Sequence, residues 1–308
     1  MERARTERSH TDGSRRIGPY RLITRLDPGG SRRLPVPVRR FIGRSADGDR
    51  TVIISAPLDG ADPGRFLVEA GAGRHLLGPW VLPVAELAAP SEAPWYASPY
   101  LPVLPLPVAL AVHGGPLPER TVRALGAALA EALAGAHAIG ITHAGLSPAS
   151  VLLAWDGPRL TCFGAVRAAA PDGEQRTGLP GLEPGSLAPE QASGGRPRPP
   201  GDIYGLGAVL AYAATGHSVP DSAELPGSLQ SLVAHCLMRD AAARPTASEV
   251  LRTVAGASST PMATVLDSAG ALLGPGWLPS RVVAAMARQS AEVLAAEVRT
   301  PISQTARI

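Results

Sequence analysis

The sequence predicts an α+β fold with a small β-rich N-terminal unit and a larger α-helical unit behind it. Runs rich in β-branched residues, bounded by Gly, Pro and Asp, dominate the chain up to about residue 105. From Pro118 onward, Ala- and Leu-rich segments with helical spacing take over. With 308 residues and 45% hydrophobic content, the chain can bury a sizeable core.

The β-rich unit is expected over residues 17 to about 105. Strands are predicted over residues 17–26 and 50–58, and residues 35–42 predict a third strand that its prolines place toward an edge. A helix is predicted within residues 63–77. Two more strands are expected in the stretches VLPVAEL and WYASPYL.

The helical unit is expected over residues 106 to 256. Its predicted helices share an apolar period of three to four residues, and they cover residues 118–140, 201–216, 228–238 and 246–254. Residues 165–198 are rich in Gly, Pro and charge, which predicts a long loop, ordered in part and mobile in part. Residues 257–308 predict a linker and then an amphipathic helix over residues 278–298.

Composition narrows the function classes. The net charge is only +3 and the arginines are scattered, so the case for nucleic acid is weak, and the Arg-rich residues 1–16 read as a disordered arm. No apolar run reaches the roughly 18 residues that span a bilayer. The two cysteines, Cys162 and Cys236, form no disulfide framework or metal-ligand spacing, which favours a cytoplasmic protein.

The stretch ITHAGLSPASVLL, residues 141–153, is the most specific motif. It aligns without a gap on H-R-D-L-K-P-x-N followed by an apolar run, which is the catalytic loop of protein kinases. From about residue 17 to residue 256 the chain therefore resembles the bacterial eukaryotic-like serine/threonine protein kinases. The resemblance implies a bilobal protein-kinase-like fold with a small β-rich N-lobe and a larger α-helical C-lobe.

The catalytic side chains of that loop are absent. In the kinase mechanism the Asp accepts the substrate hydroxyl proton, the Lys neutralises the transferring phosphate and the Asn holds magnesium. Those places hold Gly145, Ser147 and Ser150 here. The whole sequence contains neither lysine nor asparagine, so no such group can replace them from elsewhere in the chain.

The resemblance also locates the other positions of the kinase centre. Cys162, Phe163 and Gly164 are in register with D-F-G, and a neutral thiol is a poor substitute for the carboxylate that binds Mg²⁺. Ser55 replaces the lysine of V-A-I-K. Glu69 matches the glutamate that pairs with that lysine, and without its partner it is expected to be a solvated helix acid.

The glycine-rich loop is degenerate. Only Gly29 and Gly30 match G-x-G-G-x-G, and Asp27 places a negative charge where phosphates would lie. If a nucleotide does bind, its phosphates need another counter-charge, and the candidates are nearby arginines: Arg32, Arg33, Arg39 and Arg40. The apolar residues 95–106 remain suited to accept an adenine.

Residues that maintain the kinase fold are retained. Ala188, Pro189 and Glu190 reproduce A-P-E, and Arg244 fits the arginine that pairs with this glutamate. Asp202 fits the aspartate that caps the catalytic-loop backbone. His143 is expected to be a packed structural histidine rather than a general base.

Together these substitutions predict a pseudokinase, which is a non-enzyme that acts as a binding, scaffolding or allosteric module for an unidentified protein partner. No metal site, no cofactor, and no ATP or Mg²⁺ binding are expected. One alternative is a kinase or other phosphotransferase of atypical mechanism that uses acids from another position: Asp27, Glu69, Asp156 or Glu183. A second alternative is a nucleotide-binding switch without catalysis.

Overall fold

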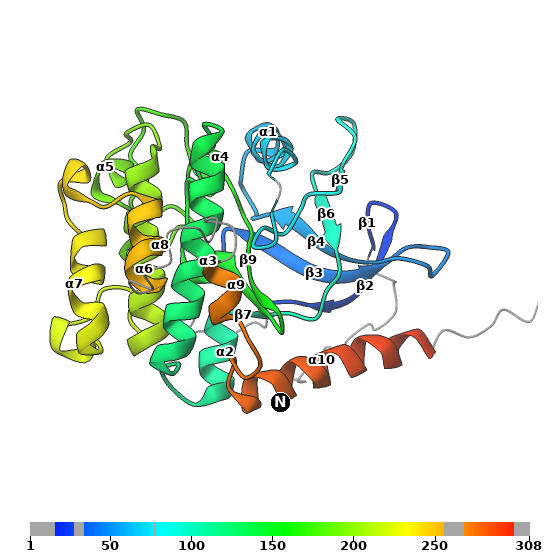
Figure 1. Ribbon diagram of the computed structural model, residues 1–308. Helices are drawn as coiled ribbons and strands as arrows, with labels where there is room; N and C mark the ends of the chain where they lie inside the picture. Colours follow the sequence, from blue (N-terminus) through cyan, green and yellow to red (C-terminus); the bar gives the residue numbers. More distant parts are fainter. Residues whose placement is uncertain (1–15, 28–33, 77, 256–267, 299–308) are drawn as a thin grey trace, which may run out of the picture.

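The computed structural model describes residues 16–27, 34–76, 78–255 and 268–298 (Figure 1). The predicted architecture is confirmed, because a curled antiparallel sheet packs beside a lobe of helices. The expected arm up to residue 15, Gly29 and Gly30, and residues 256–267 of the expected linker lie outside the described residues.

The N-lobe is built on a six-stranded antiparallel sheet in the order β1-β2-β3-β4-β6-β5. Its strands are β1 (Arg16–Ile17), β2 (Tyr20–Arg25), β3 (Val38–Arg44), β4 (Thr51–Pro57), β5 (Glu86–Leu87) and β6 (Tyr96–Pro99). The expectation that the third strand lies toward an edge is wrong, since β3 pairs with both β2 and β4. The prolines do not interfere, because Pro35 and Pro37 precede the first residue of β3.

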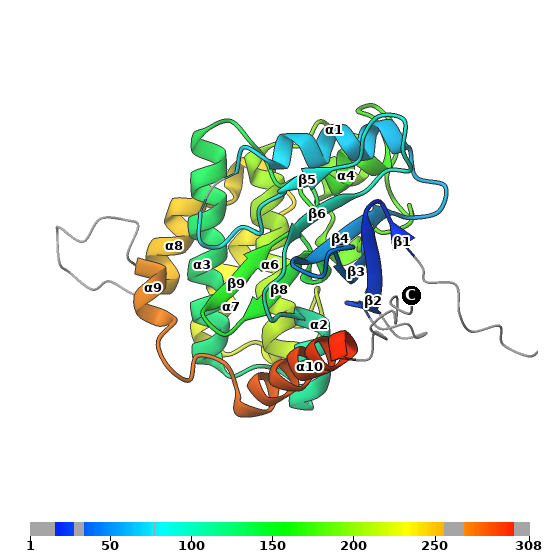
Figure 2. The same cartoon turned by 90° about the vertical axis from the view of Figure 1, so that its right-hand side faces the viewer.

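Helix α1 (Pro63–Gly73) covers one side of this sheet (Figure 2). Asp62 caps it, since the Asp62 carboxylate accepts a hydrogen bond of 2.7 Å from the Arg65 backbone N–H. Pro63 at the first helical position needs no amide partner there. The stretch VLPVAEL forms a strand only at Glu86 and Leu87.

The C-lobe contains the predicted helices within a few residues of their expected ends. Its longer helices are α2 (Leu106–His113), α3 (Glu119–Ala138), α6 (Pro199–Thr215), α7 (Gly227–Cys236) and α8 (Ala247–Ala255). A small sheet of β7 (Leu104–Pro105), β8 (Val151–Ala154) and β9 (Gly157–Leu160) lies next to the connection between the lobes. Short elements complete it: α4 (Ala165–Ala169), α5 (Pro189–Ala192), η1 (Pro148–Ser150), η2 (Pro184–Ser186), η3 (Ser222–Glu224) and η4 (Ala241–Ala243).

Two further helices follow the described C-lobe, α9 (Ser268–Leu272) and α10 (Ser280–Val298). The second corresponds to the predicted amphipathic helix. Helix α2 was not predicted, because prolines interrupt the sequence there. Pro107 nevertheless falls in its first turn, where a missing amide hydrogen costs no helical bond.

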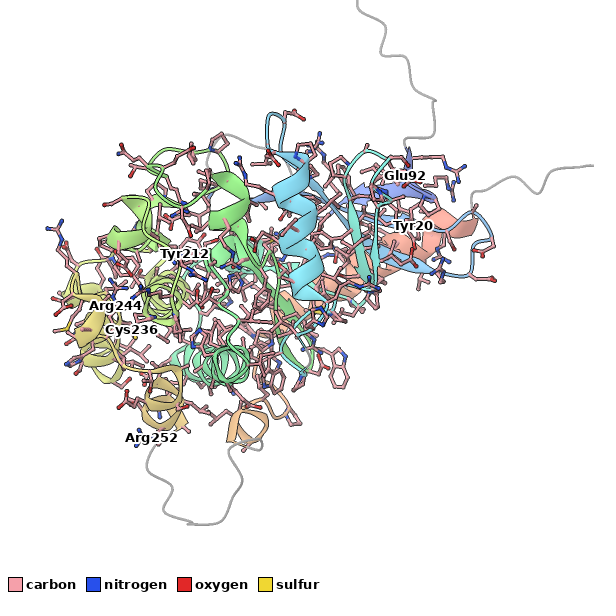
Figure 3. All side chains as sticks on the ribbon, turned by 90° about the horizontal axis from the view of Figure 1, so that it is seen from above. Tyr20, Glu92, Tyr212, Cys236, Arg244 and Arg252 are labelled. Carbon is pink, nitrogen blue, oxygen red and sulfur yellow. The ribbon has the colours of Figure 1, made fainter. Side chains whose placement is uncertain are left out.

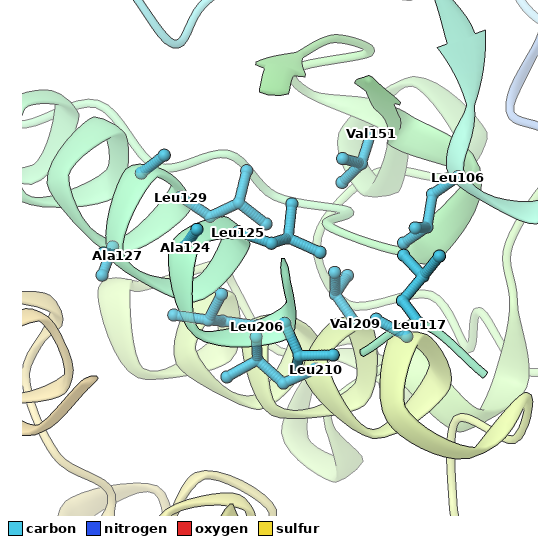
Figure 4. Packing of buried hydrophobic residues seen from close by; sticks show 14 of the residues in the cluster. Leu106, Leu117, Ala124, Leu125, Ala127, Leu129, Val151, Leu206, Val209 and Leu210 are labelled. Carbon is cyan, nitrogen blue, oxygen red and sulfur yellow. The ribbon is translucent and has the colours of Figure 1, made fainter. Parts of the chain in front are cut away.

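The core of the C-lobe is centred on α3, which packs against α6 and α8. Figure 4 shows Leu125 and Leu129 of α3 in the same buried cluster as Leu206 and Leu210 of α6. All four side chains are fully buried. Among the described residues, no helix has the length and apolar character to cross a membrane.

Substituting Leu129→Ala should lower the free energy of unfolding by about 2–5 kcal/mol, because the cavity forms in a packed interior. Leu294→Ala is the matched control, since Leu294 is 60% exposed, and its cost should stay within about 0.5 kcal/mol. Urea denaturation measures both. Equal costs for the two variants would contradict the assignment of α3 as the core helix.

Candidate functional site

Asp202 organises the loop at the mouth of the interlobe cleft. It lies in the first turn of α6 and is 1% exposed. Its two carboxylate oxygens accept hydrogen bonds of 2.8 Å from the backbone N–H groups of His143 and Ala144. The His137 Nε2 lies 2.8 Å from the same carboxylate. The capping contact expected from the sequence is therefore present.

His143 is packed inside this loop. It is fully buried, its ring lies 4.3 Å from the Phe163 ring, and its Nε2 lies 3.0 Å from the Thr161 carbonyl oxygen. Burial lowers the pKa of His143 to about 4, so the ring is neutral at pH 7. This environment is that of a structural histidine.

Ser147 and Ser150 of the loop are hydrogen-bonded to each other. The Ser150 hydroxyl donates to the Ser147 carbonyl oxygen at 2.8 Å and accepts from the Ser147 N–H at 3.0 Å, and both residues are buried. At Gly145 the backbone φ is +134°, and an added Cβ would lie 2.7 Å from the Ala165 Cβ. A carboxylate therefore has no room at Gly145 in this conformation.

An arginine occupies the cleft where the sequence lacks a lysine. Arg40 of β3 pairs in register with Ser55 of β4, so both side chains lie on the cleft face of the sheet. The Arg40 side chain is 1% exposed, and its Nε and Nη2 bind the Asp27 carboxylate at 2.8 and 2.5 Å. Its Nη1 lies 3.3 Å from the Thr161 hydroxyl. Arg40 and Ser55 line the same small cavity.

Asp27 stabilises the positive charge of Arg40. Burial acts to lower the pKa of Arg40, but the attraction and the hydrogen bonds of Asp27 outweigh burial and raise that pKa above its ordinary value. Arg39, the neighbouring candidate, points away from the cleft and binds Asp59 at 3.0 Å on the surface. Arg32 and Arg33 lie outside the described residues.

Glu69 corrects an expectation, since it is not a solvated acid. It forms an ion pair with Arg167 of α4 at 2.8 Å, and its side chain is 14% exposed. With serine at position 55, the cation closest to this carboxylate comes from the segment after β9. Gly164 permits the contact, because an added Cβ would lie 2.2 Å from the Glu69 carboxylate.

The other two candidate acids are engaged elsewhere. Asp156 binds Arg159 at 2.7 Å in the turn between β8 and β9. Glu183 accepts from the Gly185 N–H and the Ser186 hydroxyl, which stabilises the turn at η2. Of the four acids, Asp27 is the one paired with the buried cleft cation.

Magnesium does not fit the described residues at its usual positions. Cys162 is 5% exposed, and burial raises the pKa of its thiol, which keeps the thiol protonated. The Ser150 hydroxyl is bonded within its own loop. Across the described ranges, no three His, Cys, Asp or Glu side chains gather as a metal site. A hard cation prefers carboxylate and carbonyl oxygens, and these residues do not present them.

The expected pair of Glu190 and Arg244 is present in the C-lobe. Arg244 Nη1 and Nη2 contact the two Glu190 carboxylate oxygens at 2.7 and 2.8 Å. The Arg244 side chain is fully buried and also donates to the carbonyl oxygens of Met238 and Pro200. Figure 3 shows Arg244 beside Cys236, in the helical lobe and away from Tyr20 of the sheet.

The 165–198 segment is more structured than the sequence indicates. It contains α4, η2 and α5, and Arg176 lies at its centre with 0% exposure. The Arg176 guanidinium donates to the carbonyl oxygens of Ala170 and Gly195, and it binds Asp172 at 2.8 Å. A single buried arginine thus ties together three stretches of this segment, and no motif in the sequence identified it.

A cavity of about 300 Å³ lies between the two lobes. It is lined by Phe66 and Glu69 of α1, by Val38 of β3, and by Cys162 and Leu182 beyond β9. A larger groove of about 910 Å³ lies between Asp27 and Val36 of the N-lobe and Val108 and Ala149 of the C-lobe. Apolar walls and few polar groups are typical of small-molecule and peptide sites.

Comparison with known proteins identifies relatives over most of the chain. No family model matches the sequence. The chain is 34% identical over 258 residues to the probable serine/threonine-protein kinase PkwA of Thermomonospora curvata, an alignment that covers 77% of this chain and 34% of the relative. It is 30% identical over 295 residues to the serine/threonine-protein kinase AfsK of Streptomyces coelicolor, covering 87% of this chain and 35% of the relative.

A third relative is the DNA damage-responsive serine/threonine-protein kinase RqkA of Deinococcus radiodurans, 32% identical over 210 residues, with 67% of this chain and 31% of the relative covered. The chain contains a protein-kinase-like domain. Its relatives are bacterial serine/threonine protein kinases. The chain spans about a third of the length of these relatives.

The relatives overturn two expectations from the sequence. The prediction that the chain is not an enzyme is contradicted, because curated serine/threonine kinases match most of the kinase-like domain. The prediction that ATP and Mg²⁺ binding are unlikely is contradicted for the same reason, although the usual magnesium positions among the described residues hold Cys162 and Ser150. Both predictions rested on Gly145, Ser147, Ser150, Cys162 and Ser55, and they gave little weight to counter-charges from other positions, among which Arg40 was already a candidate.

His143 should make stability depend on pH. In the unfolded chain its pKa is about 6.5, and in the folded protein it is about 4, so the unfolded state binds more protons between these values. Stability should therefore fall as the pH drops, by about 2 kcal/mol from pH 7 to pH 5. His143→Gln should remove this part of the slope in urea denaturation.

The control for that measurement is His217→Gln, because the His217 side chain is 68% exposed. Other titrating groups are common to all three proteins, so the control should keep the slope of the unsubstituted protein. A His143→Gln protein with the same slope as the control would contradict the burial argument.

Proposed function

We propose that the kinase-like domain binds ATP in the interlobe cleft and transfers phosphate to a serine or threonine hydroxyl through an atypical centre. The observation that carries the proposal is Arg40, a buried cation on the cleft face directly opposite Ser55. The relatives, which are named as serine/threonine kinases, support the reaction class.

Arg40 is suited to bind phosphate oxygens. A guanidinium is permanently charged and offers two parallel N–H donors, which match phosphate as well as they match carboxylate. In the described conformation these donors are taken by Asp27. A bound triphosphate would replace this carboxylate, so Asp27 competes with the nucleotide for the same cation.

The adenine base of ATP has apolar side chains on which it can stack. Ile42 of β3 and Ile53 of β4 are paired in register and face the cleft beside Leu26. Leu152 of β8 belongs to the same cluster and approaches from the C-lobe. Val103, which lies within the predicted adenine-accepting residues 95–106, is part of this cluster as well.

Transfer would break the bond between the γ-phosphorus and its bridging oxygen and form a bond from that phosphorus to the substrate hydroxyl oxygen. The hydroxyl proton would leave to a phosphoryl oxygen or to water, because Gly145 supplies no base. Phosphoryl transfer depends mainly on positioning and charge stabilisation, so a centre with Arg40 and a fixed loop retains part of the catalysis. Because Gly145 and Ser147 replace the usual aspartate and lysine, the transfer rate should be several orders of magnitude lower than that of a kinase that retains them.

A protein substrate has a surface beside this centre. The groove of about 910 Å³ is lined by Val36 from the N-lobe and by Val108, Ala149 and Tyr212 from the C-lobe. Ala149 lies within the loop of His143, so an extended segment in this groove would pass close to the cleft. Both cysteines are free and buried, which supports action in a reducing compartment such as the cytoplasm.

Arg40→Gln tests the role of the cation. The loss of a charge-assisted contact should weaken ATP binding about 10- to 100-fold, as measured by calorimetry or thermal shift with and without Mg²⁺. Arg39→Gln is the matched control on the neighbouring position, and it should bind ATP like the unsubstituted protein. Asp27→Asn combined with Arg40→Gln avoids an unpaired buried charge and checks that the loss is not caused by unfolding.

Transfer is measured with γ-labelled ATP and a serine- and threonine-containing protein substrate. Slow labelling that Arg40→Gln abolishes would support the proposed centre. ATP binding without any labelling would overturn the transfer step and leave a nucleotide-dependent switch. The absence of ATP binding in the unsubstituted protein, with and without Mg²⁺, would overturn the proposed function.

A further inference from the structure

Helix α10 joins the two lobes. Its N-terminal half lies on the C-lobe, where Val282 and Met286 are buried in the same cluster as Leu106 and Leu110 of α2. Its C-terminal half reaches the N-lobe, where it contacts β2. Figures 1 and 2 show α10 running from α2 of the helical lobe to β2 of the sheet.

Val293 of α10 lies in the cleft cluster. It is 2% exposed and packs in the cluster that contains Leu26, Ile53 and Leu152. The next residue, Leu294, is 60% exposed. Among the described side chains of the C-terminal half, Val293 therefore packs in the cleft cluster, while its neighbour in sequence faces outward.

This cluster is closed in the described conformation. Leu26 and Ile53 come from the N-lobe and Leu152 comes from the C-lobe, and none of the three is more than 2% exposed. The cavity bordered by Ile53, Ser55 and Arg40 holds only about 20 Å³, which is enough for a water molecule and far less than a purine requires. A base can stack on these surfaces only after the lobes separate.

We propose that α10 is an autoinhibitory strap that holds the lobes together, with Val293 as its latch in the cleft cluster. Because α10 is packed on both lobes, they cannot separate unless its C-terminal half leaves β2. Release of Val293 opens the cleft, exposes the apolar stacking surfaces and frees the nucleotide site. The nucleotide part of this inference rests on the proposed function, whereas the strap itself does not.

Cys162 reports cleft opening without any nucleotide. Its thiol lies in the cleft at 5% exposure, and burial raises its pKa, so alkylation should be slow in the closed protein. Cys236 is fully buried in the C-lobe core and reports global unfolding in the same sample. Quantitative mass spectrometry after iodoacetamide treatment resolves the two cysteines.

Val293→Asp and Leu294→Asp form the matched pair, because both add the same charge at adjacent positions of α10. We expect Val293→Asp to raise the alkylation rate of Cys162 at least tenfold, with the rate of Cys236 unchanged, and Leu294→Asp to behave like the unsubstituted protein. Val293→Ala, which is milder, should give a smaller increase in the ratio of Cys162 to Cys236 labelling.

Two results would overturn the strap. Equal Cys162 rates in Val293→Asp and Leu294→Asp would show that Val293 does not hold the cleft. An equal rise at Cys162 and Cys236 in both Val293 variants would show that Val293 only stabilises the whole fold.

ATP titration of the same proteins separates the strap from the proposed function. Tighter ATP binding by Val293→Asp, by at least tenfold, is the expected result. Faster Cys162 labelling with no ATP binding in any variant would keep the strap and overturn the proposed function. Equal ATP affinity and equal Cys162 rates in all variants would overturn the strap and keep the proposed function.

Discussion

The Asp202 carboxylate is the interaction on which the rest of the cleft depends. A charge that is 1% exposed must be compensated, and here two backbone N–H groups and the His137 ring provide the compensation. These bonds fix His143 and Ala144 to the first turn of α6, which packs against the core helix α3 of the C-lobe. The loop therefore keeps its shape even though glycine and serine occupy the positions of its usual catalytic side chains.

The cleft contains two ion pairs although it lacks the usual lysine. Arg40 enters from the strand next to Ser55 and is held by Asp27, and Glu69 is held by Arg167 from the segment after β9. Each pair is short and largely buried, as a charge in a cleft of low polarity requires. The same requirement supports the proposal that a bound phosphate would compete with Asp27 for Arg40.

Hydrogen bonds hold the 165–198 segment in place, whereas apolar packing of α10 connects the two lobes. Arg176 satisfies its donors on carbonyl oxygens within the segment, which is a polar and local solution. Helix α10 contributes apolar side chains to one cluster of the C-lobe and to a second cluster that both lobes share, and these contacts join parts of the chain that are far apart in sequence. The buried arginine holds a loop in place, and α10 connects the two lobes.

The amino-acid sequence alone determines the two-lobe order, the main helices and the frame of the His143 loop, because these follow from local spacing and from a short contiguous motif. It also predicts the Glu190 and Arg244 pair, since a motif specifies both ends. Only the tertiary structure decides the pairing of Arg40 with Asp27, the pairing of Glu69 with Arg167 and the packing of Val293 in the cleft cluster. Strand register and lobe packing bring these groups together, and neither is encoded in a contiguous stretch of residues.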